Sequence, residues 1–102
     1  MQRRNVNEAT SWFSVLQTND RAQTAVMKLN PGAWSGEKGN EHPQSEQILL
    51  VLEGEVVAEI GRERALLQPG DVVVVPAGED HRFGNESSKE ALTFNVYVPP
   101  AY

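Results

Sequence analysis

The sequence contains no cysteine, which excludes disulfides, thiolate nucleophiles and thiolate metal ligands. Histidine is scarce as well, since the chain of 102 residues holds only His42 and His81. Any chemistry must therefore use nitrogen and oxygen groups. The lack of cysteine suits a reducing compartment, and we expect a cytoplasmic protein.

Long apolar runs are missing too. The opening residues, MQRRNVNEATSWFSVLQ, never reach the core of about seven apolar residues of a signal peptide, and no later run approaches a membrane span. Nine basic residues stand against 14 acidic ones, and they are scattered or interleaved with acids, as in GRERA. We expect a soluble protein that binds neither membranes nor nucleic acid.

What the sequence does contain is a series of short apolar segments separated by Gly, Pro, Asp and Asn, which is typical of β-strands. No stretch shows a sustained helical period, although NVNEAT could supply a helical turn. Glycine-containing turns between neighbouring segments predict antiparallel hairpins in one domain that spans residues 1–102. The expected strands are 12–17, 22–30, 47–53, 56–60, 64–68, 71–75, 80–84 and 92–98.

Two of these strands, ILLVL and VVVV, are apolar on both faces. This pattern predicts strands inside a sandwich or barrel and not on an open sheet, so the fold class is all-β. We expect one interior built from alternating apolar rows, to which Leu49, Val51, Val73, Val75, Phe83 and Phe94 contribute.

Polar side chains head two of the apolar rows. In an extended strand Gln47 shares a face with Leu49, and His81 shares one with Phe83. Polar groups at the mouth of an apolar barrel are where a small-molecule pocket needs its orienting contacts. His42 lies five residues before Gln47, on the opposite face of an unbroken strand, but a kink at Pro43 can turn it inward.

The segment GDVVVVPAGEDHRFGN, residues 70–85, matches the second cupin motif at each of its positions, which are Gly70, Pro76, Gly78, His81 and Asn85. The first motif fits residues 36–54 in Gly36, His42 and Gly54, but Gln44 stands at its second histidine and Gln47 at its glutamate. The chain thus resembles a small single-domain cupin. The resemblance implies a double-stranded β-helix, or jelly-roll barrel, commonly dimeric.

The family's usual metal set would map onto His42, Gln44, Gln47 and His81. Divalent Fe, Mn, Ni and Zn favour imidazole nitrogen and carboxylate oxygen, so a shell that has lost one imidazole and one carboxylate should bind such an ion weakly. We expect His42, Gln47 and His81 to be the metal ligands. Additional pocket or ligand residues are Gln44, Glu46, Glu41 and Phe83.

Two hypotheses for the function stay open. The first is a metal-dependent enzyme acting on a small organic molecule, with Glu41, Glu46 and Tyr97 as nearby groups for proton transfer. The second is a non-catalytic small-molecule binding or sensing barrel without metal. We also expect a homodimer, because small barrels leave edge strands to cover and the apolar segment SWFSVLQ could cross onto a partner. The PPAY segment at 99–102 is expected to pack on its own barrel.

Overall fold

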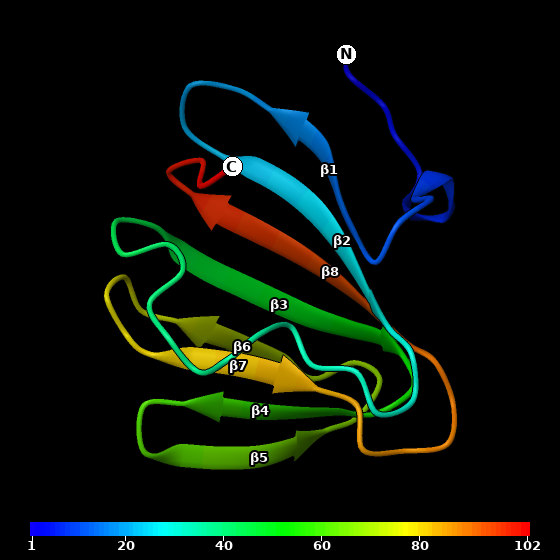
Figure 1. Ribbon diagram of the computed structural model, residues 1–102. Helices are drawn as coiled ribbons and strands as arrows, with labels where there is room; N and C mark the ends of the chain where they lie inside the picture. Colours follow the sequence, from blue (N-terminus) through cyan, green and yellow to red (C-terminus); the bar gives the residue numbers. More distant parts are fainter.

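The computed structural model describes residues 1–102 and contains eight strands and one 3-10 helix, η1 (Val6–Glu8) (Figure 1). All eight strands expected from the sequence form, and no strand end shifts by more than one residue. They are β1 (Phe13–Thr18), β2 (Gln23–Leu29), β3 (Glu46–Glu53), β4 (Val56–Ile60), β5 (Glu63–Leu67), β6 (Val72–Val75), β7 (His81–Gly84) and β8 (Ala91–Val98). No helix is long and apolar enough to cross a membrane.

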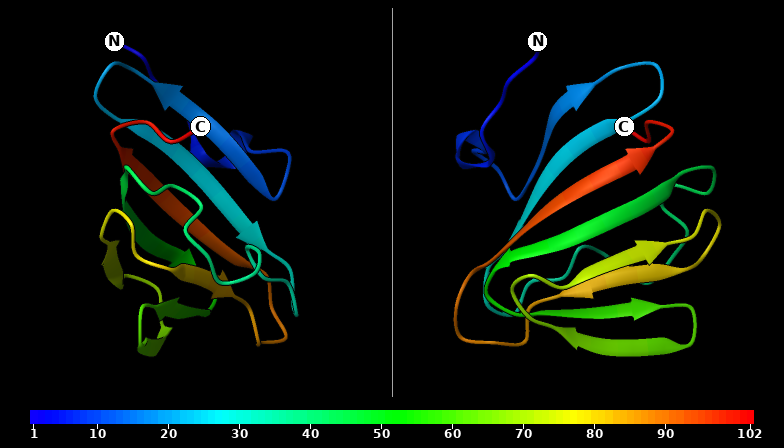
Figure 2. Two further views of the ribbon diagram at one scale, coloured as in Figure 1. Left: turned by 60° about the vertical axis from the view of Figure 1, so that its left-hand side comes forward. Right: turned by 180° about the vertical axis from the view of Figure 1, so that it is seen from behind.

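Two antiparallel sheets build the predicted double-stranded β-helix. One has the strand order β1-β2-β8-β3-β6, and the other has the order β5-β4-β7. Figures 1 and 2 show the strands converging at one end of the molecule and fanning out at the other. Strands β3 and β7 begin at the wide end and β8 finishes there, so their terminal residues meet at one mouth.

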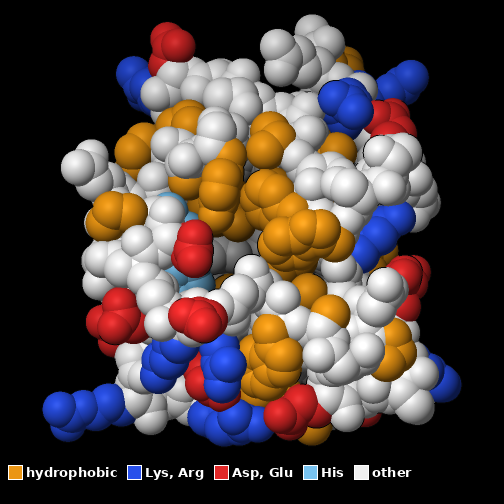
Figure 3. All heavy atoms as spheres, viewed as in Figure 1, with side chains coloured by type: hydrophobic (Ala, Val, Ile, Leu, Met, Phe, Trp, Pro, Cys, Tyr) orange, Lys and Arg blue, Asp and Glu red, His pale blue; other side chains and the backbone are white.

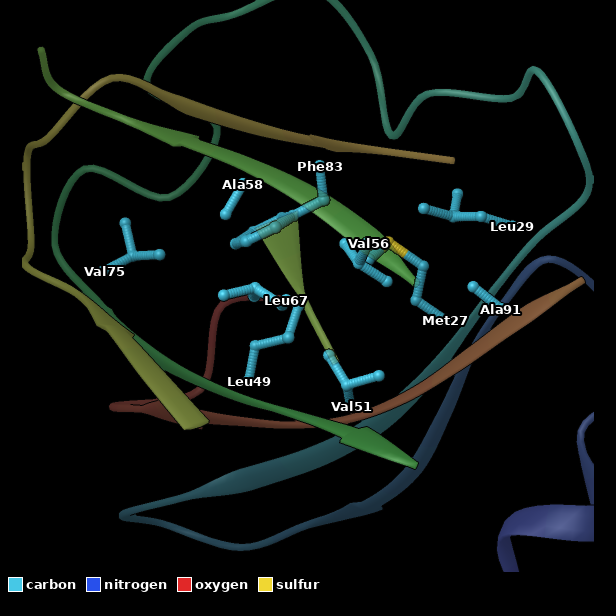
Figure 4. Packing of buried hydrophobic residues seen from close by; sticks show 10 residues of the cluster. All are labelled: Met27, Leu29, Leu49, Val51, Val56, Ala58, Leu67, Val75, Phe83 and Ala91. Carbon is cyan, nitrogen blue, oxygen red and sulfur yellow. The ribbon is translucent and has the colours of Figure 1, made fainter. Parts of the chain in front are cut away.

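The core lies between the two sheets (Figure 4) and confirms the expected places of Leu49, Val51, Val75 and Phe83, while the partly buried Val73 packs against them. Burial of each large side chain of this kind contributes about 1.5–3 kcal/mol. The ten buried residues of this core are Met27, Leu29, Leu49, Val51, Val56, Ala58, Leu67, Val75, Phe83 and Ala91.

Phe94 does not belong to this core, contrary to the sequence-based expectation. It packs against a second cluster that contains Ala9, Leu16, Val26 and Leu92. The reason is the alternation of β8, whose inward positions carry polar and aromatic groups while Leu92 and Phe94 share the outer face. The apolar residues Leu92 and Phe94 therefore lie on the outer face of β8, which residues of the N-terminal segment such as Ala9 cover.

Strands β3 and β6 belong to the barrel as expected, although they are apolar on both faces and only one face is buried. Val72 and Val74 of β6 are 58% and 52% exposed, and Ile48 of β3 is 39% exposed. Ile48 pairs with Val74 across the two strands, so the exposed side chains are neighbours on the outer face of the five-stranded sheet. Only one face of each strand is covered within the chain.

The loop between β2 and β3, residues 30–45, crosses the front of the barrel (Figure 1). It is attached to β7 at two points, where Trp34 bridges to Gly84 and Gly39 bridges to His81. The Gly39 and His81 backbones exchange hydrogen bonds of 3.3 and 3.0 Å. This attachment carries the following residues, His42 among them, to the mouth of the barrel.

Candidate functional site

His42, Gln47 and His81 come together at the wide end of the barrel. They reach it from the loop, from the start of β3 and from the start of β7, and they are only 5%, 3% and 5% exposed. His42 Nε2 lies 2.9 Å from Gln47 Oε1, and the centroids of the two imidazole rings are 4.5 Å apart. The side chain of His42 turns inward despite its sequence distance from Gln47, as a kink at Pro43 predicts.

Both imidazoles are oriented in the same way by the backbone. His42 Nδ1 lies 3.0 Å from the carbonyl oxygen of Ser45, and His81 Nδ1 lies 2.9 Å from that of Glu79. A carbonyl oxygen can only accept, so each Nδ1 carries a proton and donates it. Nε2 is then the second nitrogen of each ring, and in His42 it contacts Gln47. A backbone carbonyl that accepts from Nδ1 is also a common partner of metal-binding histidines.

Behind His42 runs a chain of buried polar groups. Gln47 Nε2 donates to Asn95 Oδ1 at 2.8 Å, Asn95 Nδ2 donates to Thr93 Oγ1 at 3.0 Å, and Thr93 Oγ1 donates to the Met27 carbonyl at 3.2 Å. Reversing both amides lets Gln47 Nε2 donate to His42 Nε2, Asn95 Nδ2 donate to Gln47 Oε1 and Thr93 Oγ1 donate to Asn95 Oδ1. The two amides can therefore satisfy this series of hydrogen bonds in either direction.

A cavity of about 230 Å³ opens beside these residues. Figure 3 shows histidine side chains in a hollow of the surface, with hydrophobic side chains along one side of it and acidic ones along another. Its hydrophobic lining is Trp12, Phe13, Met27, Phe83, Tyr97 and Tyr102. Its polar lining is Ser35, Glu37, Glu41, Gln47 and His81.

The additional pocket residues expected from the sequence fall in different places. Phe83 lies in the cavity wall and is 1% exposed, and Glu41 lines the cavity from the loop. Gln44 and Glu46 are exposed and are not part of the wall. Glu46 lies on the outer face because it precedes Gln47 by one residue in β3. Only Glu41 is therefore positioned to bring the expected carboxylate to the site.

Burial shifts the pKa of three groups that line the cavity, which are His81, Tyr97 and Tyr102. It lowers the pKa of His81, helped by the neighbouring His42, while the Glu79 carbonyl, Glu41 and Asp80 oppose the shift. It raises the pKa of Tyr97 far above its ordinary value, with a further contribution from Tyr102. His81 is thus held toward its neutral form, and Tyr97 keeps its proton and can serve as a donor but not as a base.

Sequence reasoning missed Asn95, Thr93 and Gln23, which are all buried. Gln23 Oε1 accepts from the backbone N–H groups of Ala101 and Tyr102, and its Nε2 donates to the Tyr102 carbonyl. The expectation that the 99–102 segment packs on its own barrel is thereby confirmed. A polar row in LTFNVYV, with Thr93 and Asn95 two residues apart, was the available signal for the chain behind Gln47.

Comparison with known proteins agrees with this architecture. The chain is 37% identical to the acireductone dioxygenase of Leishmania infantum over 86 residues, 71% of this chain and 25% of that protein, so it spans about a quarter of this relative. The crystal structure of TT1209 from Thermus thermophilus is 30% identical, with a TM-score of 0.84 over 97% of this chain and 98% of that one.

A structure from Klebsiella pneumoniae, described as an uncharacterized conserved protein with a double-stranded β-helix domain, is 21% identical and covers 100% of this chain and 94% of its own. Its TM-score is 0.86, which shows a shared fold. The family described as the cupin domain matches residues 25–97, the part of the chain that holds both motifs. The chain therefore belongs to the cupin family.

Proposed function

We propose that this cupin binds a small organic molecule in the cavity, beside a divalent metal ion held by His42, Gln47 and His81. The observation that carries the proposal is the shared orientation of the two imidazoles, because each donates Nδ1–H to a backbone carbonyl and has Nε2 as its second nitrogen. The similarity to an acireductone dioxygenase supports metal use, within the quarter of that protein that aligns.

The donor set fits a divalent transition metal, although with low affinity. His42 Nε2 and Gln47 Oε1 lie 2.9 Å apart, so a neutral imidazole and the amide oxygen could both contact one ion if their hydrogen bond were given up. Neutral imidazoles and an amide bring no negative charge to an ion, and no group of three or more His, Cys, Asp and Glu side chains gathers at any site in the chain. Two imidazoles and an amide oxygen suit Fe, Mn, Ni or Zn better than Ca or Mg.

A bound metal would polarise an oxygen group of the organic ligand. The chain's own groups would position that ligand, because Phe83 and Met27 supply apolar walls and Tyr97 supplies a protonated hydroxyl. Glu37 and Glu41 are the carboxylates in the cavity lining. These groups support ligand binding, and a metal-dependent reaction requires in addition that one of the two carboxylates acts as its base.

A second candidate is a binding or sensing barrel that holds no metal. The series of hydrogen bonds behind His42 supports this candidate. It runs from His42 through Gln47 and Asn95 to Thr93, and each of these side chains has a hydrogen-bond partner without a bound ion. No buried side-chain nitrogen or oxygen lacks a hydrogen-bond partner. In this case the same hydrogen-bonded side chains orient the organic ligand.

Calorimetric titration of Mn, Fe, Ni and Zn into tag-free, chelator-treated protein separates the two candidates. The first predicts saturable binding of one ion that His81→Ala abolishes and Glu46→Gln, on the outer face, leaves unchanged. Absence of binding by the wild-type protein, or binding that survives His81→Ala, would assign the cavity to the metal-free function.

A further inference from the structure

The outer part of the cavity is a cluster of aromatic rings. The ring centroid of Phe13 lies 5.8 Å from that of Trp12, 4.8 Å from that of Tyr102 and 6.4 Å from that of Tyr97. The Tyr97 and Tyr102 rings are 5.1 Å apart and nearly perpendicular. All four side chains line the cavity, and Trp12 and Tyr102 are more than half exposed. Ring faces grouped in this way attract organic cations.

Charge in the cavity is of one sign. Glu37 and Glu41 line it, and no Lys or Arg does. The basic residues of the neighbouring elements are engaged elsewhere. Lys28 Nζ donates to the Ala9 carbonyl at 2.9 Å, Lys38 Nζ donates to the Gly61 carbonyl, and Arg82 is paired with Glu59 at 3.1 Å. The cavity therefore offers an anion no counter-charge of its own.

The position of Tyr102 in this cluster is fixed by the barrel. Gln23 is 1% exposed and binds the backbone of Ala101 and Tyr102 through three hydrogen bonds of 2.7–3.1 Å. The Tyr102 ring then lies over Phe13 at the rim of the cavity. Burial and the neighbouring Glu41 raise the pKa of Tyr102, so the ring at the rim stays uncharged. A cation at the rim thus meets neutral rings.

We propose that the rim formed by Trp12, Phe13, Tyr102 and Glu41 is a subsite for an ammonium group of the organic ligand. The inference rests on the proposed function, since it concerns the ligand of the same cavity. The ammonium group contacts the ring faces and is balanced by the acidic side of the rim. The rest of the ligand extends between Met27 and Phe83 toward His81.

The test compares choline with its neutral carbon isostere, 3,3-dimethylbutan-1-ol, by NMR titration of the tag-free, chelator-treated protein. The two probes have the same shape and differ in charge, so their affinity ratio isolates the cation. We expect choline to bind about fivefold more tightly, the size of a cation–π contact at a partly exposed site. Equal affinities, tighter binding of the isostere, or no binding of either probe overturns the proposal.

Variants then place the cation. Glu41→Gln and Tyr102→Leu should each reduce the affinity ratio by several-fold, with little change in the affinity for the isostere, whereas Glu46→Gln should preserve the ratio. A ratio unchanged in both rim variants contradicts the assigned subsite. Zinc titration of the same samples reports the metal site separately, so loss of metal binding with an intact ratio would refute the proposed metal and leave the ammonium subsite standing.

Discussion

Gln47 Oε1 and His42 Nε2 lie 2.9 Å apart although their side chains would point to opposite faces of a regular strand. The loop makes this possible, since its bridge to β7 at Gly39 delivers His42 to the mouth of the barrel before β3 begins. The amide stands at the position where the family motif has a carboxylate. At this position the chain therefore lacks the negative charge that the motif supplies.

Replacing Gln47 by Glu should restore that charge. We expect Gln47→Glu to bind Zn or Ni at least about tenfold more tightly than the wild type, equivalent to about 1.4 kcal/mol. The change is tolerated locally because Asn95 can rotate its amide and donate Nδ2 to the new carboxylate, while Thr93 then donates to Asn95. Calorimetric titration measures the effect.

Glu46→Gln is the matched control, because it changes one carboxyl group next in sequence but on the outer face. It should leave metal affinity within about twofold of the wild type, since an exposed side chain there is screened from the site. If Gln47→Glu binds metal no better than the wild type, Gln47 is not a ligand.

The stability of the metal-free protein should depend on pH through His81. Its folded pKa lies below the ordinary value of 6.5, mainly because the ring is buried. Between the two pKa values the unfolded chain binds a proton that the folded protein does not, so the free energy of unfolding falls as the pH drops through this window. Glu8 and Glu59, whose pKa values are lowered from 4.5 by arginine partners, contribute only at more acidic pH.

We therefore expect urea unfolding of chelator-treated protein to show a stability that decreases as the pH is lowered below about 6.5, the ordinary histidine value. In His81→Asn this part of the pH profile should be flatter. An identical slope in the variant would show that another group is responsible.

The sequence predicted those parts of the molecule that follow from local alternation. Gln47, Leu49 and Val51 share a face in the structure as the strand period requires, and the motif spacing located His81. Phe94 was misplaced because apolar character alone does not say which side of β8 faces the other sheet. The polar pair Thr93 and Asn95 was the better guide to the inner face of β8, because these two side chains are hydrogen-bonded to each other.

Contacts between distant residues were beyond such reasoning. Gln23 and Tyr102 are 79 positions apart, and nothing in either neighbourhood indicates that they bond. The position of Glu41 also depends on the path of the loop between β2 and β3, where no hydrophobic periodicity indicates the direction of the side chain. The cluster of aromatic rings consequently forms only in the folded protein, where Phe13 of β1 meets Tyr97 of β8 and Tyr102.

Loss of the Gln23 side-chain bonds should loosen that rim. Gln23→Met keeps a similar volume but removes three bonds to the backbone of residues 101 and 102 and one of 2.9 Å to Thr18 Oγ1. At about 1 kcal/mol for each bond, the free energy of unfolding should fall by roughly 2–4 kcal/mol. Urea denaturation measures it, with exposed Gln68→Met as a control that should change by less than about 0.5 kcal/mol.

A homodimer is the remaining expectation, and the outer face of the five-stranded sheet is where we expect the partner to bind. Val72, Val74, Ile48 and Val98 are 58%, 52%, 39% and 42% exposed there. Val74 pairs with Ile48 across β6 and β3, and β6 is the edge strand of the sheet. Clustered apolar side chains at an edge mark an association surface or an aggregation hazard.

Size-exclusion chromatography with light scattering at micromolar concentration should show a dimer for the wild type and a monomer for the double variant Val72→Lys, Val74→Lys. Both valines are exposed within the chain, so the variant should fold normally, with a circular dichroism spectrum like that of the wild type. Leu66→Lys is the control, because Leu66 is 55% exposed on the other sheet and its replacement should leave the dimer intact. A monomeric wild type contradicts the homodimer, and a dimer that survives the double variant moves the interface to another face, such as the one around the exposed Trp12.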